Sequence, residues 1–168
     1  MSAPSEGDLA RAAARLGLAL RERSWRMATA ESSTGGLIGH AITMIPGASD
    51  YYAGGVICYS NMAKEVTLGV PHELIEAHGA VSEEVAAALA VGAAHRFDTE
   101  LGLSVTGIAG PEGGSAQKPV GTHYLAVARR GHPARVEHLV FTHDRDGNRA
   151  AASLAALELA LDEVATAG

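Results

Sequence analysis

The stretch at 28–39, ATAESSTGGLIG, constrains the fold of this chain more than any other segment. Small alternating residues lead into three consecutive hydroxyl side chains at 32–34, and a glycine pair then opens a segment with helical apolar spacing. This order is typical of a strand that ends where a helix begins. Two interpretations of the hydroxyls stay open. Ser33 or Thr34 is an ordinary N-cap, which these residues alone favour, or a serine is a nucleophile beside N–H groups that hold an oxyanion.

The rest of the chain predicts helices alternating with strands. We expect helices over 7–23, 35–44, 61–68, 82–97 and 148–164, a helical turn over 71–77, and strands over 26–30, 51–60, 101–106, 122–128 and 135–142. Asn61 would cap the helix that it begins, and residues 130–133 would join the last two strands as a hairpin. Early alternation followed by a hairpin and a final helix predicts the α/β class, a three-layer α/β/α fold with helices on both faces of a mixed sheet.

Length and composition predict one domain over 1–168, with a disordered start at 1–6. The 13 Lys and Arg against 19 Asp and Glu exclude a sequence-blind nucleic-acid binder, which needs a basic surface. The single cysteine, Cys58, excludes an internal disulfide, and its apolar surroundings predict a buried structural thiol. No apolar run is long enough to span a membrane, and the N-terminus lacks a signal-peptide pattern. We therefore expect a soluble cytoplasmic protein without a membrane partner.

A second loop with unusual chemistry lies at 59–64, YSNMAK. Tyr59 would end a strand, and Lys64 would lie one turn into the following helix. A lysine in a half-buried cleft loses its proton more readily, because burial disfavours the charged form. Lys64 could then take a proton from a serine, directly or through the tyrosine hydroxyl. A solvated lysine and a packed tyrosine ring are the alternative, which most surface lysines favour.

A third loop, TGIAGPEGGS at 106–115, is dense in glycine. Backbone N–H groups in such a loop can face an anion without interference from Cβ atoms. Its spacing matches neither the Walker loop nor the dinucleotide fingerprint. A ligand cradle and a flexible surface loop stay open as interpretations.

Arg145 and Arg149 lie four residues apart near the start of the last helix, where positive charge opposes the helix dipole. An anion held between them would remove this conflict, and surface neutralisation by Asp144 and Asp146 is the alternative. The chain has eight histidines. None is paired with another His or with acids at metal-ligand spacing, so we expect no metal site.

Six short motifs in a fixed order resemble one known family, the CinA C-terminal domains, also called nicotinamide-nucleotide amidohydrolases. The motifs are AESSTGG (30–36), PGAS (46–49), YSNMAK (59–64), GAVS (79–82), TGIAGP (106–111) and KPVGT (118–122). The resemblance covers nearly all of the chain from residue 28 onward. One position departs from it, because Ser33 stands where the family usually has cysteine.

The resemblance implies hydrolysis of the carboxamide of nicotinamide mononucleotide (NMN), without a metal or an organic cofactor. It assigns the nucleophile to Ser32 and the activating partners to Tyr59 and Lys64. N–H groups near Thr34 to Gly36 would then hold the oxyanion, and the glycine loop with Arg145 or Arg149 would hold the 5′-phosphate. The full set of expected substrate-contacting residues is Glu31, Ser33, Thr34, Gly35, Gly36, Asn61, Thr106, Gly107, Gly110, Gly113, Gly114, Arg145 and Arg149.

Two other functions stay open at this point. A non-catalytic member of the family would bind a nucleotide or a partner protein without turnover, and an amidase for another small amide would keep the site but change the pocket. The expected partner is a small mononucleotide substrate. A homo-oligomer, with a dimer as the simplest case, is suggested by the Ala- and Leu-rich helix surfaces.

Overall fold

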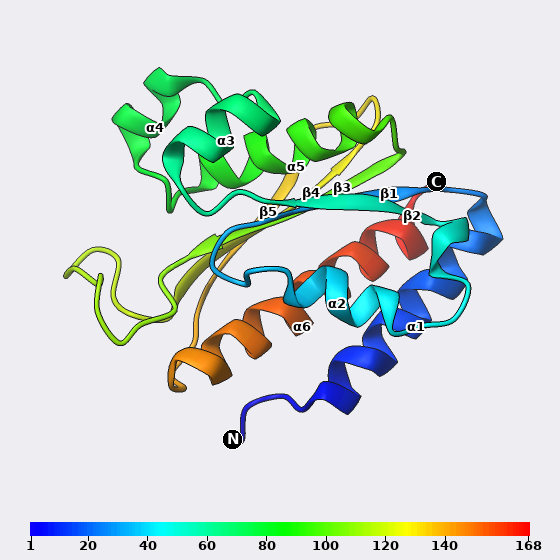
Figure 1. The fold of residues 1–168 in the computed structure, drawn as a ribbon, viewed down its shortest axis with the longest axis horizontal. Coiled ribbons are helices and arrows are strands. Elements are labelled where there is room, and N and C mark those ends of the chain that lie inside the picture. Colours follow the sequence, from blue (N-terminus) through cyan, green and yellow to red (C-terminus); the bar gives the residue numbers. More distant parts are fainter.

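A five-stranded mixed sheet forms the middle layer of the fold (Figure 1), in a computed structural model that describes residues 1–168. The sheet has the order β2-β1-β3-β4-β5. Its strands are β1 (Met27–Glu31), β2 (Tyr52–Ile57), β3 (Leu101–Gly107), β4 (Thr122–Arg129) and β5 (Arg135–Val140). Strands β1, β2 and β3 are mutually parallel, whereas β4 and β5 are antiparallel to their neighbours and form the expected hairpin. The expected mixed sheet is therefore confirmed.

Helices cover both faces of the sheet, which completes the expected α/β/α layers (Figure 1). One layer holds α1 (Glu6–Arg23), α2 (Leu37–Thr43) and α6 (Arg145–Thr166), and the other holds α3 (Asn61–Leu68), α4 (His72–His78) and α5 (Glu83–Phe97). A short 3-10 helix, η1 (Ala48–Asp50), precedes β2. None of these helices combines the length and the apolarity that a membrane span requires.

Apolar clusters lie on both sides of the sheet, two of them large and a third made of four alanines of α5 and β4. The largest contains leucines of α1 and α6 with the β3 and β4 side chains of the same face, and the second lies under α3, α4 and α5. Small side chains let helix α5 lie close to the sheet. A Cβ at Gly102 of β3 would collide with the Ala90 carbonyl oxygen of α5. Alanine and glycine therefore set the short distance between this helix layer and the sheet.

Several element ends differ from the expectation because other side chains cap them. Helix α1 begins at Glu6, and Ser5 and Asp8 form a capping box, so residues 5 and 6 belong to a structured helix start. Helix α3 is capped by Ser60, not by Asn61. Helix α6 begins at Arg145 rather than at residue 148, because Asp144 accepts a hydrogen bond from the backbone of its first turn.

Candidate active site

The three loops singled out in the sequence leave the sheet at one edge. Strands β1, β2 and β3 are parallel neighbours, so the residues after each strand lie together at their carboxyl ends. Two hydrogen bonds between backbone groups continue the strand pairing into these loops. Ser32 N–H donates to the Val105 carbonyl at 3.0 Å, and Cys58 N–H donates to the Glu31 carbonyl at 2.9 Å. The register of the sheet thus brings the residues after β1 and β2 side by side.

A cavity of about 170 Å³ opens at this edge. Its wall combines residues from the ends of all three parallel strands with the start of α3, the segment before α5 and the start of α6. The lining residues are Ser32, Ser33, Tyr59, Asn61, Lys64, Ala80, Val81, Thr106, Gly107, Ala109 and Arg145. All three expected catalytic residues are among them. Five of the expected substrate-contacting residues line it as well: Ser33, Asn61, Thr106, Gly107 and Arg145.

Lys64 is the buried titratable side chain of this cavity, with only 1% of its surface exposed. It is the fourth residue of α3, whose N-terminus is fixed by Ser60 Oγ accepting from Ala63 N–H at 3.0 Å. The ammonium nitrogen Nζ lies 3.0 Å from Ser32 Oγ, 2.8 Å from the Cys58 carbonyl oxygen and 3.3 Å from the Tyr59 carbonyl oxygen. Burial lowers the pKa of Lys64 below its ordinary value.

These contacts suit an amine that exchanges one proton with Ser32. A neutral amine has two N–H groups and one lone pair. The two carbonyl oxygens, of Cys58 and Tyr59, can accept the N–H groups, which leaves the lone pair for the Ser32 hydroxyl proton. After the proton moves, the ammonium still has an acceptor for each of its three N–H groups. The site therefore accommodates both protonation states of Lys64 without an unpaired donor.

Glu31 organises the loop between β1 and α2 and does not line the cavity. Its carboxylate is 2% exposed and accepts hydrogen bonds from Thr34 Oγ1 at 2.7 Å and from the backbone N–H groups of Gly36, Ile38 and Gly39 at 2.8–3.1 Å. This carboxylate satisfies the N-terminus of α2, where no side-chain cap is present at Gly36. The interpretation of Ser33 or Thr34 as the N-cap is therefore wrong.

In the loop between β1 and α2, the N–H groups without a protein acceptor lie earlier in the sequence than the Thr34 to Gly36 stretch that was expected to hold the oxyanion. Gly35 N–H donates to the Ser32 carbonyl, and Gly36 N–H donates to Glu31, so neither amide is available to an oxyanion. The N–H groups of Ser33 and Thr34 donate to no protein acceptor. The Ser33 hydroxyl is also buried without a hydrogen-bond partner. Unpaired buried donors are costly, and they gather here directly after Ser32.

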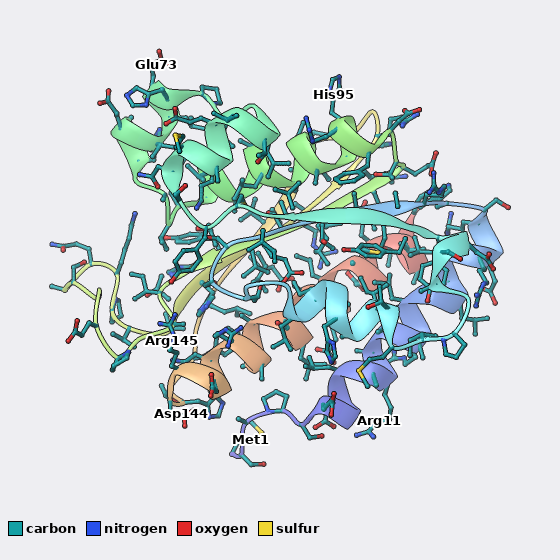
Figure 2. The ribbon with its side chains drawn as sticks, in the orientation of Figure 1. Met1, Arg11, Glu73, His95, Asp144 and Arg145 are labelled. Atoms are coloured by element: carbon teal, nitrogen blue, oxygen red, sulfur yellow. The ribbon has the colours of Figure 1, made fainter.

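Tyr59 and Arg145 meet at the mouth of the cavity. The Arg145 guanidinium donates to the Gly110 carbonyl at 2.6 Å and to the Tyr59 hydroxyl at 3.4 Å. Figure 2 shows Arg145 at the start of α6, beside the long loop that follows β3. The Tyr59 side chain is largely exposed, and its hydroxyl has no hydrogen bond to Ser32 or Lys64. Lys64 thus reaches Ser32 directly, without the tyrosine bridge that the sequence left open.

Arg149 lies behind the cavity wall rather than in it. Its guanidinium donates to the Ser33 carbonyl at 3.2 Å and to the Thr34 carbonyl at 3.0 Å, and it pairs with Asp146 at 3.4 Å. Of the two arginines expected to hold an anion, only Arg145 lines the cavity. The positive charge of Arg149 near the N-terminus of α6 is offset by backbone oxygens of the β1–α2 loop.

The glycine loop contributes less to the cavity than its sequence suggested. Gly107 and Ala109 line the cavity, whereas the expected contacts Gly110, Gly113 and Gly114 do not, and neither do Thr34, Gly35 or Gly36. Lys118 fastens the loop to α4 by donating to the His78 carbonyl at 3.0 Å. Sequence reasoning about side-chain chemistry missed Ala80 and Val81, whose only signal was the GAVS motif before α5. No group of three or more His, Cys, Asp or Glu side chains is placed to hold a metal ion.

Comparisons with known proteins agree with this fold. The model of the CinA C-terminal domain family matches residues 9–164. A CinA-like protein from Geobacter sp. (strain M21) is 52% identical over 143 residues, which cover 85% of this chain and 34% of that protein. A putative competence-damage inducible protein from Symbiobacterium thermophilum is 47% identical over 152 residues, which cover 86% of this chain and 36% of that protein. The chain thus spans about a third of the length of the curated relatives it matches.

Solved structures match nearly from end to end. A competence/damage inducible protein from Agrobacterium tumefaciens has 38% sequence identity and a TM-score of 0.89, covering 96% of this chain and 99% of that one. Competence damage-inducible protein A from Klebsiella pneumoniae has 31% identity and a TM-score of 0.91, covering 95% and 99%. The family match, the sequence relatives and the shared fold lead to one conclusion: this chain belongs to the CinA C-terminal domain family.

Proposed function

We propose that the protein hydrolyses the carboxamide of NMN, giving nicotinic acid mononucleotide and ammonia, with Ser32 as the nucleophile. The substrate comes from the resemblance to nicotinamide-nucleotide amidohydrolases. The observation that carries the chemistry is the 3.0 Å contact between Ser32 Oγ and the buried amine of Lys64. A serine beside a base of lowered pKa is the arrangement that activates a hydroxyl nucleophile.

The first half of the reaction releases ammonia. Lys64 takes the hydroxyl proton while Ser32 Oγ forms a bond to the carboxamide carbon, and the carbonyl electron pair moves to oxygen. The unpaired N–H of Ser33, which lines the cavity, would donate to this oxyanion. When the C–N bond breaks, the Lys64 ammonium gives its proton to the leaving nitrogen. The products of this half are ammonia and an ester on Ser32.

The second half restores the serine. Water attacks the ester carbon, and Lys64, neutral again, accepts a proton from this water. The ester C–O bond then breaks, and Lys64 returns the proton to Ser32 Oγ. Nicotinic acid mononucleotide forms as the carboxylic acid and gives its proton to solvent, where the released ammonia takes it up as ammonium. Each proton taken up by Lys64 is returned within the same half-reaction.

The size of the cavity supports a substrate with one small ring at the reacting end. Its volume of about 170 Å³ is close to the ~150 Å³ cavity that holds benzene in an engineered protein core. A pyridine ring with its carboxamide would occupy this space, and the ribose phosphate would extend through the mouth. Arg145 stands at that mouth and would meet the 5′-phosphate.

Ammonia release from NMN tests the proposal directly. Purified wild-type protein should release ammonia in proportion to nicotinic acid mononucleotide, and Ser32→Ala should lose turnover while keeping its fold by circular dichroism. A Ser5→Ala variant is the matched control, because it removes a serine hydroxyl that does not line the cavity, at the start of α1. Near-normal turnover in Ser32→Ala would remove Ser32 as the nucleophile. Binding of NMN without turnover by the wild type would favour the non-catalytic alternative.

Nicotinamide and nicotinamide riboside distinguish an amidase for another small amide. If the phosphate contributes to recognition through Arg145, both should react with a lower kcat/KM than NMN does. Equal or faster turnover of nicotinamide would reassign the substrate while keeping the Ser32 chemistry.

A further inference from the structure

The two successive carbonyl groups held by Arg149 set the direction of the peptide that follows the proposed nucleophile. Arg149 Nε donates to the Ser33 oxygen and Nη2 donates to the Thr34 oxygen. The peptide between Ser33 and Thr34 is trans, because the only cis peptide bond in the chain joins Gly110 and Pro111. In a trans peptide the C=O and N–H groups point in opposite directions. The Thr34 N–H therefore points away from Arg149, but Thr34 is 0% exposed and does not line the cavity. The unpaired donor that this loop carries on a cavity-lining residue is the Ser33 N–H.

Neither helix stability nor a surface ion pair explains this placement of Arg149. It lies in the second turn of α6, near an N-terminus whose dipole disfavours positive charge. Its ion-pair partner Asp146 is 89% exposed, and pairs of this kind are worth about 0–1 kcal/mol. The backbone contacts across 115 and 116 residues of sequence are the stronger interactions, since a charged donor strengthens a hydrogen bond.

The loop is shaped to receive this guanidinium. Gly35 has a φ of +60°, and a Cβ there would lie 3.3 Å from Arg149 Nη2. A planar fork is also needed, because two carbonyls of neighbouring residues must be met by nitrogens in a fixed relation. Lysine offers a single point charge and cannot hold both oxygens in the same way.

We infer that Arg149 is a positioning residue: by holding the Ser33 and Thr34 carbonyls it fixes the Ser33 N–H as an oxyanion-binding donor for the reaction on Ser32. The inference rests on the proposed function. In this role Arg149 aligns a donor for the transition state. The family resemblance instead offered Arg149, as an alternative to Arg145, for binding the substrate phosphate. Loss of Arg149 lets the peptide rotate, so the oxyanion loses a preorganised donor while the ground-state substrate keeps its contacts with the cavity wall.

The experiment compares wild type, Arg149→Gln and Arg149→Lys in ammonia release from NMN. Arg149→Gln should lower kcat by about 10- to 100-fold, as expected when an oxyanion donor is misplaced. KM should stay within about threefold of wild type, because the substrate contacts are retained. Arg149→Lys should recover thermal stability but only part of kcat. An increase in KM at unchanged kcat would instead make Arg149 a substrate-binding residue and would overturn the inference.

Arg23→Gln serves as the matched control. Arg23 also donates to a backbone carbonyl, that of Ala167, but it does so at the other end of α6. Its replacement should lower the melting temperature by a similar amount to Arg149→Gln and leave kcat unchanged. If both variants lose kcat in parallel with stability, the role of Arg149 is structural only.

A boronic acid probe separates this inference from the proposed substrate. Pyridine-3-boronic acid can accept Ser32 Oγ at boron while the hydroxyl proton passes to Lys64. The tetrahedral adduct is negatively charged at boron and has a boron-bound hydroxyl in the oxyanion position, so Ser32→Ala should abolish its tight binding. Arg149→Gln, or Arg149→Lys if the first variant does not fold, should weaken binding of the probe by about the same factor as kcat. Unchanged probe affinity would overturn the inference. If wild type releases no ammonia from NMN, the proposed function fails, and the probe still decides the role of Arg149.

Discussion

Replacing Lys64 by methionine gives the sharpest test of the buried amine, because stability and activity should respond differently to pH. Burial of the side chain, with 1% exposed, penalises the ammonium form in the folded state. Against this, Nζ makes three hydrogen bonds, each worth about 1.5–3 kcal/mol when the donor is charged. These opposing contributions are of similar size, so the stability change at one pH decides little.

The pH dependence of the stability difference is unambiguous in sign. The pKa of Lys64 is lowered in the folded protein and close to its ordinary 10.5 in the unfolded chain. Between these two values the unfolded chain binds more protons, so wild type gains stability as the pH rises toward 10.5. The gain is about 1.4 kcal/mol for each unit by which the pKa is lowered. Lys64→Met lacks this gain, and its free energy of unfolding should fall relative to wild type as the pH increases.

Urea unfolding of wild type and Lys64→Met at several pH values from 7 to 10 measures this difference. Lys118→Met is the matched control, because Lys118 is the only other lysine and also donates to a backbone carbonyl, but from the exposed loop. With two lysines in the chain, a ¹³C-lysine NMR titration gives two side-chain signals, and Lys118→Met assigns them. Parallel stability curves for wild type and Lys64→Met would refute the burial argument.

Activity supplies the second half of this test. The kcat/KM of wild type should rise with pH as Lys64 loses its proton in the free enzyme. Lys64→Met should lose about 10²- to 10⁴-fold in rate, the usual contribution of a general acid–base group. Lys118→Met should keep the wild-type pH profile. A wild-type rate that is independent of pH over the range where the NMR signal titrates would separate Lys64 from the chemistry.

Three further predictions concern other charged or buried groups. Arg145→Gln should raise the KM for NMN about 10- to 100-fold, which is the effect of losing a charged hydrogen bond of about 1.5–3 kcal/mol. The KM for nicotinamide riboside, which has no phosphate, should stay unchanged. Equal increases in KM for both substrates would exclude a phosphate contact. Glu31→Gln should lower the free energy of unfolding by about 1–3 kcal/mol, because an amide NH₂ would face N–H donors; an unchanged urea midpoint would contradict this. Burial lowers the pKa of His123, so the unfolded chain binds more protons below about pH 6.5 and the stability of the folded protein falls as the pH drops. The His123→Gln variant should therefore lose less stability than wild type between pH 7 and 5. Equal losses in the two proteins would contradict this prediction.

The sequence predicted the parts of the fold and site that depend on local pattern. Short apolar segments were enough to place the strands. That Ser32 and Lys64 act together was implied by the family resemblance, and the parallel pairing of β1 with β2 explains why they meet. The role of Glu31 was harder to predict, because a carboxylate after a strand looks the same whether it binds a ligand or caps a helix. The choice between Arg145 and Arg149 for the anion site was left open for a similar reason, and only Arg145 lines the cavity. The carbonyl partners of Arg149 lie 115 and 116 residues away and carry no side-chain signature.

The glycine loop shows a second limit of sequence reasoning. Glycine density indicates that a backbone can approach a ligand, but it does not indicate which residues do so. The Arg145 guanidinium donates a hydrogen bond to the Gly110 carbonyl, and no residue of the loop beyond Ala109 lines the cavity. Only the part next to β3 contributes to the wall, because that part is still positioned by the strand.

The proposed reacting pair comes from separate strand–loop units, because Ser32 and Lys64 are 32 positions apart in the sequence, and only the pairing of β1 with β2 brings them together. A partly refolded chain that has closed the β4–β5 hairpin alone has no working centre. The first appearance of ammonia after dilution from denaturant would therefore time the docking of the N-terminal half of the sheet, and a lag behind the recovery of helical circular dichroism would measure how late that docking occurs.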